Sequence, residues 1–238
     1  MLAAVLDIDE PDVNARAVAV GKGILASMAQ PFEEESIWVR KLAPESRQKL
    51  WRELGIFPGG PLFVLQDAVA RGMTNIDGDY VSLAKTSLRM GIATFYAVQV
   101  PLEMGQDAIF GTPTPHTAQV DLGILDPDYV NIVPNGHEPF IGFALVQAAE
   151  SEEVQQRAKA AGAKGLRIVG SIETGQEMMQ RLSESEVFVG LTGNWLSEEY
   201  AIATGAIDVF AMDMNCSVPS LGEIADRYNT KLVAVSEL

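Results

Sequence analysis

The second half of the chain alternates short runs of β-branched residues with segments that have helical spacing. Consecutive parallel strands need a long crossover connection, which is usually a helix. The pattern therefore predicts an α/β domain built on a parallel sheet. The predicted strands are residues 129–133, 166–169, 186–189, 207–212 and 231–235. The predicted helices between them are residues 139–161, 174–182, 195–204 and 220–228.

The first half of the chain has a different pattern and is predicted to be mostly helical. Asp12 precedes an alanine-rich periodic segment and is a candidate N-cap. The predicted helices are residues 13–28, 44–54, 61–72 and 79–92. In the last of these, Val81, Ala84, Leu88 and Ile92 fall on one face. We expect a mainly helical region, residues 1–123, followed by a Rossmann-like α/β domain, residues 124–238.

The charge balance excludes two classes of partner. The chain has 32 acidic and 17 basic residues, a formal net charge of −15. Nucleic acids and anionic membrane surfaces are bound by basic faces, so neither is expected as a partner. No apolar run approaches the roughly 18–20 residues of a membrane helix, and no targeting segment is evident. We expect a cytoplasmic protein.

The carboxyl ends of the predicted strands are where an open parallel sheet binds ligands. Three loops at these ends carry polar residues suited to chemistry. They are residues 134–139, 170–175 and 213–219. The first contains His137, the second Glu173 and the third Cys216, the only cysteine. Imidazole, carboxylate and thiolate groups are common ligands of transition metals, so this edge is a candidate metal site.

Each of the three residues also has an ordinary structural interpretation. His137 could be a hydrogen-bonded loop residue, and Glu173 could be an acid stabilised by the dipole at a helix start. Cys216 could be a small buried apolar residue. A single cysteine also excludes an intramolecular disulfide, and this chain alone cannot supply several thiolates to an iron–sulfur cluster.

Four segments of the sequence resemble one known family. They are residues 107–115 (DAIFGTPTP), 122–137 (LGILDPDYVNIVPNGH), 158–177 (AKAAGAKGLRIVGSIETGQE) and 193–221 (GNWLSEEYAIATGAIDVFAMDMNCSVPSL). In this order, they resemble anaerobic nickel–iron–sulfur carbon monoxide dehydrogenase, over roughly residues 51–238. The resemblance is to the central Rossmann-like region of that enzyme.

The resemblance implies a function and a set of ligands. Members of the family oxidise CO with water to CO2, releasing two electrons and two protons, at a nickel–iron–sulfur cluster held by one histidine and several cysteines. The family's H-G-H-x-P loop appears here as residues 135–139, which places His137 at the ligand position. The family's D-V-Q-C-x-x-P loop appears as residues 213–219, which makes Cys216 the matching thiolate.

The chain departs from the family pattern at a third loop. The family's G-I-C-C-T-G-N-E appears here as residues 170–177 (GSIETGQE), so both cysteines are replaced and Glu173 stands at the ligand position. The first histidine of H-G-H is Asn135. The cysteine motifs and the further domain that complete the enzyme are also missing from this sequence. We therefore expect the isolated chain to be incomplete and not to oxidise CO.

Two alternatives remain open beside the dehydrogenase interpretation. The chain could be a non-catalytic scaffold or interaction subunit, or a degenerate copy. It could also be a metalloenzyme that binds one Zn²⁺ or Fe²⁺ through His137, Glu173 and Cys216. The family resemblance further implies the remaining dehydrogenase segments or subunits and an electron carrier such as ferredoxin as partners, and a homodimer.

Overall fold

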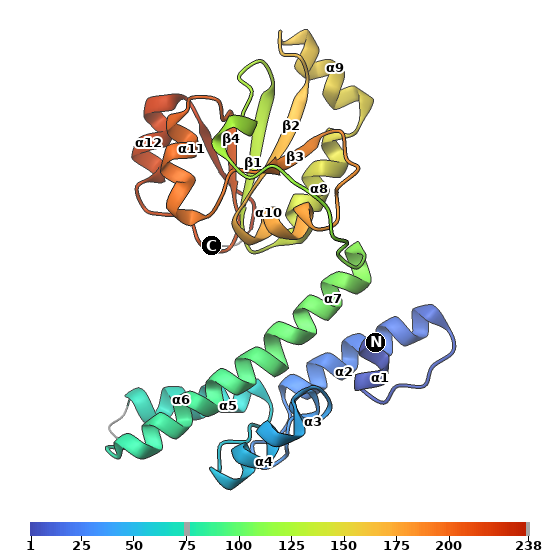
Figure 1. Cartoon of the computed structure of the whole chain (residues 1–238), viewed down its shortest axis with the longest axis vertical. Helices are drawn as coiled ribbons and strands as arrows, with labels where there is room; N and C mark the ends of the chain where they lie inside the picture. The colour runs from blue at the N-terminus through green and yellow to red at the C-terminus, as the bar shows by residue number, and fades with distance from the viewer. Residues whose placement is uncertain (74–76, 237–238) are drawn as a thin grey trace. The chain divides into compact units, whose positions relative to one another are not determined.

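The computed structural model describes residues 1–73 and 77–236. The chain forms two compact units, Met1–Gly111 and Thr112–Leu238 (Figure 1). The domain boundary predicted from the sequence was after Gly123. Residues 237–238, which end the predicted α/β domain, lie outside the described residues. Within the described ranges, no helix is long and apolar enough to cross a membrane.

The N-terminal unit is helical, as predicted. Its elements are α1 (Leu2–Val5), α2 (Val13–Met28), α3 (Ile37–Leu42), α4 (Glu45–Glu53), α5 (Pro61–Met73), α6 (Tyr80–Thr94), the π-helical turn η1 (Phe95–Gln99) and α7 (Val100–Phe110). Asp12 caps α2 as expected, since its carboxylate accepts the N–H of Ala15 at 2.8 Å. Asp79 caps α6 in the same way.

The core of the N-terminal unit is built around Trp38. This side chain is fully buried, and its indole N–H donates a hydrogen bond to Ser27 Oγ at 2.8 Å. Val5, Ala97 and Met104 complete the buried cluster. The bond to Ser27 matters because a buried indole N–H without a partner would be destabilising.

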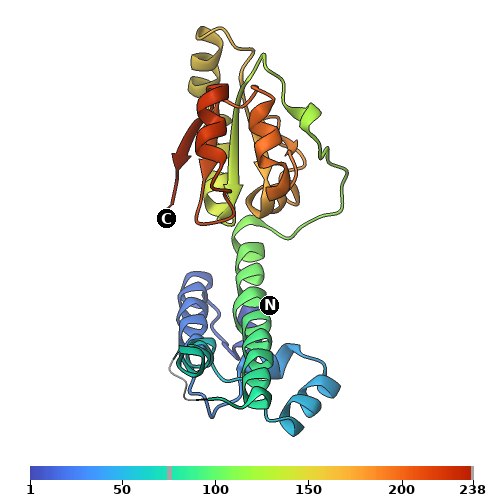
Figure 2. The same ribbon diagram turned by 90° about the vertical axis from the view of Figure 1, so that its left-hand side faces the viewer.

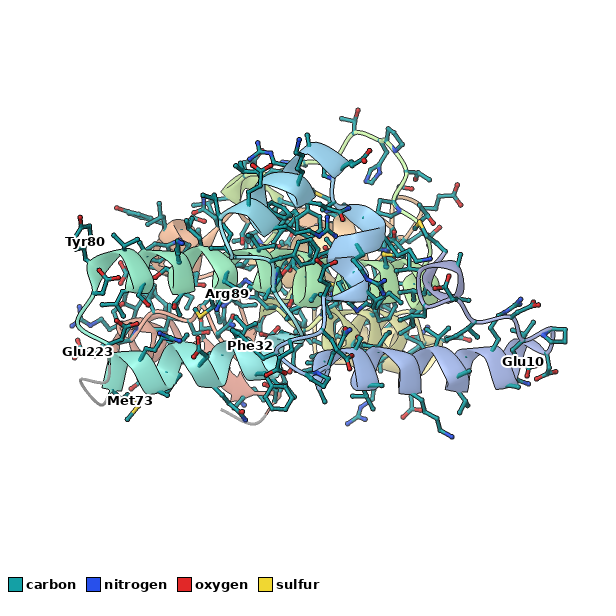
Figure 3. All side chains as sticks on the ribbon, turned by 90° about the horizontal axis from the view of Figure 1, so that it is seen from below. Glu10, Phe32, Met73, Tyr80, Arg89 and Glu223 are labelled. Carbon is teal, nitrogen blue, oxygen red and sulfur yellow. The ribbon has the colours of Figure 1, made fainter. Side chains whose placement is uncertain are left out.

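A second cluster of the N-terminal unit joins α6 to an earlier loop. The Arg89 guanidinium lies 4.8 Å from the centre of the Phe32 ring (Figure 3) and donates to the carbonyl of Gly55. The apolar face predicted for this helix is not the buried one. Val81 and Leu88 are exposed, whereas Thr86 and Ala93 are buried, so the side of α6 that carries Thr86 and Ala93 faces the unit's interior.

The C-terminal unit is the predicted parallel α/β domain. Its strands are β1 (Val130–Gly136), β2 (Leu166–Ser171), β3 (Phe188–Leu191), β4 (Val209–Met212) and β5 (Lys231–Ala234). Its helices are η2 (Leu122–Ile124), α8 (Pro139–Ala149), α9 (Glu152–Ala160), α10 (Ile172–Met179), η3 (Trp195–Ser197), α11 (Glu198–Ala203) and α12 (Leu221–Tyr228). The strands pair in parallel in the order β3-β2-β1-β4-β5. The fold prediction is therefore confirmed.

Helices cover both faces of this sheet (Figure 1, Figure 2). Successive strand residues point to opposite faces, so Ile168 and Val169 enter different cores. Ile168 packs with residues of α8 and α10, including Met178. Val169 packs with residues of α11 and α12 and with Phe210 of β4. Burial on both faces explains why the strands read as nearly continuous apolar runs.

One predicted helix of the α/β unit is wrong in its length. The segment 139–161 was expected to form a single helix, but α8 ends at Ala149 and α9 begins at Glu152. Ser151 has extended backbone angles, and its hydroxyl accepts the N–H of Val154. A serine that caps a new helix interrupts the old one, because its own backbone leaves the helical region.

Candidate metal centre

The three predicted loops lie together at the carboxyl edge of the sheet. Asn135 of β1 pairs with Ser171 of β2 and with Met212 of β4, so the loops that follow these strands start at the same level. We call residues 134–139 the histidine loop and residues 213–219 the cysteine loop. Glu173 lies in the first turn of α10, after β2, so the histidine loop that follows β1 stands between it and the cysteine loop that follows β4.

His137 and Glu173 are brought into direct contact. His137 Nε2 lies 3.0 Å from Glu173 Oε2, and both side chains are about a quarter exposed, 26% and 29%. The distance suits a hydrogen bond. The other ring nitrogen, Nδ1, is buried and has no hydrogen-bond partner among the described residues.

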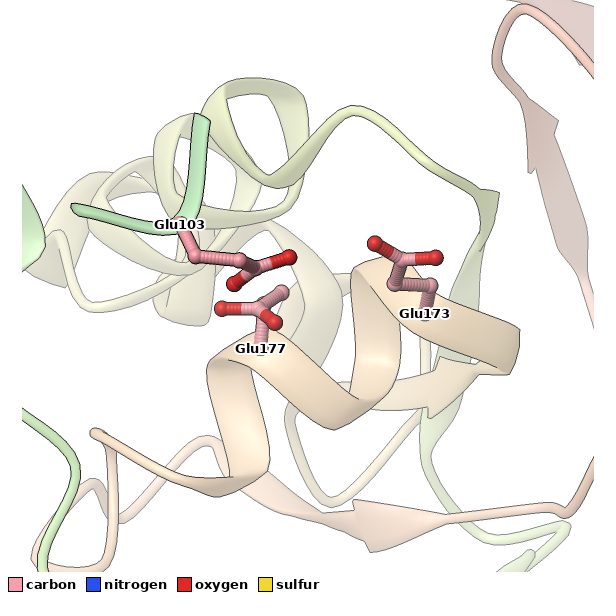
Figure 4. A group of neighbouring side chains, drawn as sticks. All are labelled: Glu103, Glu173 and Glu177. Carbon is pink, nitrogen blue, oxygen red and sulfur yellow. The ribbon is translucent and has the colours of Figure 1, made fainter. Parts of the chain in front are cut away.

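Glu173 is not the only acid on this helix. Figure 4 shows Glu173 and Glu177 one turn apart along α10. Glu177 is buried and forms an ion pair with Arg181, whose side chain is also buried. A paired, buried carboxylate is held in place by its partner, so Glu177 has a structural role in the helix. Glu173 is the more accessible acid at this edge.

Cys216 lies at the same edge but does not join the histidine–glutamate pair. Its residue is exposed. Among the residues that the structure describes, no group of three ligand atoms within 4.8 Å of one another includes its sulfur. Partial burial raises the pKa of the Cys216 thiol, and the nearby carboxylates of Glu198, Asp213 and Glu173 raise it further. The thiol is therefore protonated at neutral pH, and a cation is needed to stabilise the thiolate there.

Two of these loops contain strained backbone. Ile172 has φ of 54° and Cys216 has φ of 57°, both in the left-handed region. This region costs free energy for residues with a Cβ, and most of all for a β-branched residue such as Ile172. Such strain persists only where the surrounding structure imposes it, and it is frequent at functional sites.

The polar residues that support the two loops were not predicted from the sequence. Asp213 accepts the backbone N–H groups of His137 at 2.7 Å and of Glu138 at 3.0 Å, together with the Thr174 hydroxyl at 2.7 Å. Asn135 donates from its side chain to the carbonyl of Cys216 at 3.1 Å. The one sequence signal for this arrangement was the glycine that precedes His137, since it leaves room for a neighbouring group.

Glu198 is a third supporting residue that the sequence did not reveal. It is 1% exposed, and its Oε2 accepts the N–H of Val218 in the cysteine loop. Burial raises the pKa of Glu198, although the hydrogen bonds from the backbone of Val218 and from the side chain of Asn135 act in the opposite direction.

The ligands of this chain do not by themselves fit the nickel–iron–sulfur cluster that the resemblance implies. Such clusters are held mainly by thiolates, and the chain has one cysteine. The resemblance implies a thiolate at the position of Glu173, and a carboxylate is a harder ligand that is poorly matched to iron–sulfur chemistry. An imidazole and one cysteine are ligand types that the resemblance also implies. The residues at this edge are therefore too few to hold such a cluster.

Comparisons with known proteins agree with this fold. The Prismane/CO dehydrogenase family matches residues 1–238, so the likeness begins well before residue 51. The carbon monoxide dehydrogenase of Archaeoglobus fulgidus is 53% identical over 236 residues, which are 99% of this chain and 37% of that protein. Carbon monoxide dehydrogenase 2 of Methanosarcina mazei is 55% identical over 209 residues, 88% of this chain and 33% of that protein.

A solved structure shows the same likeness in three dimensions. The nickel-free carbon monoxide dehydrogenase of Thermococcus sp. AM4 matches with a TM-score of 0.88 and 33% identity, over 97% of this chain and 36% of that one. The chain thus spans about a third of the length of these relatives. Since the family match covers every residue, the chain belongs to the Prismane/CO dehydrogenase family.

Proposed function

We propose that this chain is the central, ligand-bearing segment of a carbon monoxide dehydrogenase-like protein. In this proposal, His137 and Cys216 bind a transition metal at the carboxyl edge of the sheet, and Glu173 occupies the position of a family thiolate. The observation that supports it is the arrangement of three potential ligands on adjacent loops, in a chain 53% identical to a carbon monoxide dehydrogenase along nearly its whole length.

The proposed substrate pair of the complete assembly is CO and CO2. Oxidation of CO with water gives CO2, two protons and two electrons, so the assembly needs an electron acceptor such as ferredoxin. A related solved structure is described as an acetyl-CoA synthase/carbon monoxide dehydrogenase with nickel-containing [Fe4S4] clusters, which supports further subunits as partners. The homodimer, the cytoplasmic location and the anaerobic setting remain predictions.

Titration with Co²⁺ tests the metal site. We expect a thiolate-to-cobalt charge-transfer band that Cys216→Ser abolishes and His137→Ala weakens. His116→Ala is the matched control, because His116 is the other histidine and lies exposed in a loop. The raised thiol pKa means that the proton competes with the metal, so the affinity should increase from pH 6.5 to pH 8.5. A band of equal strength in Cys216→Ser would contradict the proposal.

Assay of CO oxidation tests whether the chain is sufficient alone. We expect no reduction of methyl viologen under CO by the purified chain, even after anaerobic incubation with Ni²⁺, Fe²⁺ and sulfide, because its ligands do not complete a cluster. A complete carbon monoxide dehydrogenase assayed in parallel is the positive control. Viologen reduction by this chain above the rate of the Cys216→Ser variant would show that the prediction is wrong.

A scaffold role is the second candidate function. The contact of His137 Nε2 with Glu173 favours it, since this contact occupies a nitrogen that would otherwise bind metal. A scaffold would contain no metal after anaerobic purification and would show no cobalt band. Elemental analysis for nickel, iron, zinc and acid-labile sulfide therefore separates the two functions.

A further inference from the structure

Asp213 connects the three loops that carry the potential ligands, because it belongs to one and its carboxylate accepts bonds from the other two. It belongs to the cysteine loop, three positions before Cys216. Its Oδ1 accepts the N–H of His137, and its Oδ2 accepts the N–H of Glu138 and the hydroxyl of Thr174, the residue after Glu173. The side chain is 1% exposed, so these three bonds replace water around a buried carboxylate.

The histidine loop makes bonds in return. The side-chain amide of Asn135 donates to the carbonyl of Cys216 at 3.1 Å and to Ser217 Oγ at 3.2 Å. The carbonyl of Asn135 accepts the N–H of Asp213 at 2.9 Å. Each loop thus holds the backbone of the other, and the separation of His137 from Cys216 is set by bonds in both directions.

Gly136 allows the close approach of Asp213. A Cβ at this position would lie 1.7 Å from Asp213 Oδ1, and the backbone has φ of +132°. Only glycine fits such a contact and such a conformation. The carboxylate therefore lies directly against the backbone of the histidine loop, beside the N–H of His137 itself.

We infer that Asp213 is a positioning residue for the metal site, which holds the backbone of His137 so that its imidazole stays beside Glu173. This inference rests on the proposed function. Asp213 is assigned no ligand role here, because it is 1% exposed and both of its oxygens already accept hydrogen bonds from the two N–H groups and the Thr174 hydroxyl. Its effect on metal affinity therefore acts through His137.

The test uses Asp213→Asn in the full chain, with two measurements. Asparagine keeps the shape but has one acceptor oxygen and places an NH2 group against the donors. In the metal-free protein, we expect the amides of His137 and Glu138 to exchange with solvent at least tenfold faster. In the Co²⁺ titration, we expect affinity to fall roughly 10- to 100-fold, as for other partners that orient metal ligands. In a chain that already carries His137→Ala, adding Asp213→Asn should lower the Co²⁺ affinity little further.

Asp208→Asn is the matched control. Asp208 also bonds to β1, since its carboxylate accepts the N–H of Asn131 at 2.8 Å, but it lies at the opposite edge of the sheet. This variant should leave exchange at His137 and the Co²⁺ affinity unchanged. If Asp213→Asn fails to fold, Thr174→Val, which removes one of the three bonds, should still weaken Co²⁺ binding severalfold.

Two results would overturn the inference. One is an unchanged rate of amide exchange at His137 and Glu138 in the Asp213→Asn variant. If that variant does not fold, the corresponding result is an unchanged Co²⁺ affinity in the Thr174→Val variant. The other is an equal loss of Co²⁺ affinity with and without His137, which indicates a general structural effect. If the wild-type chain shows no cobalt band, the proposed function fails, while amide exchange still decides whether Asp213 holds the histidine loop.

Discussion

Substitution of Gly136 by alanine is expected to destabilise the α/β unit by about 3 kcal/mol or more. The new Cβ would lie 1.7 Å from Asp213 Oδ1, so either the carboxylate or the loop must move. Moving the carboxylate breaks bonds to a buried charged group, each of which contributes about 1.5–3 kcal/mol. Holding alanine in the unfavourable backbone conformation costs about 1–3 kcal/mol more.

Urea unfolding followed by circular dichroism measures this effect, and Gly222→Ala is the matched control. Gly222 lies in α12, and a Cβ added there would meet no atom within 4 Å, so alanine should be neutral or stabilising by up to about 1 kcal/mol. A Gly136→Ala variant as stable as Gly222→Ala would show that the loop yields easily, and it would also weaken the role assigned to Asp213.

Substitution of Phe210 by alanine is expected to have the largest effect on stability. Phe210 is fully buried in β4 and packs with Val133, Val169 and residues of α11 and α12. Truncation of a buried phenylalanine costs about 3–5 kcal/mol, through lost apolar burial and the cavity left behind. Since a domain is stable by only about 5–15 kcal/mol, much of the stability of the unit should be lost.

Tyr200→Ala separates this packing effect from the general loss of an aromatic ring. Tyr200 is on α11 and is 68% exposed, so its truncation should change the free energy of unfolding by less than about 1 kcal/mol. Both variants are compared with the wild type in the same urea titration. Equal losses for Phe210→Ala and Tyr200→Ala would contradict the assignment of Phe210 to the core.

The parallel sheet could be predicted from sequence because its signal is local. Strands buried on both faces are recognisable as apolar runs, and the helices between them leave few alternatives in topology. The break between α8 and α9 was missed because Ser151 is an ordinary polar residue until its backbone angles are known. Similarly, the buried face of α6 depends on which elements pack against it, as the contacts of Arg89 with Gly55 and Phe32 illustrate, and helical periodicity does not encode these partners.

The candidate site could be predicted only in part. The strand-end rule places His137, Glu173 and Cys216 at one edge, and the structure shows contact for the first two alone. The bonds from Asp213 were not predictable, since it lies 76 residues from His137 along the chain. Contacts of this kind arise from the register of β1 against β4, which no short sequence pattern specifies.

The bonds of Asp213 have a consequence for protein engineering. The three loops should be replaced together when the site is redesigned, because the carboxylate of Asp213 connects them. A cysteine-containing version of residues 170–177 can be grafted with its backbone anchored only if the threonine at position 174 is kept, since its hydroxyl provides the bond to Asp213. The family motif G-I-C-C-T-G-N-E has threonine at that position, so the bond to Asp213 and the cysteines of that motif are compatible in one loop.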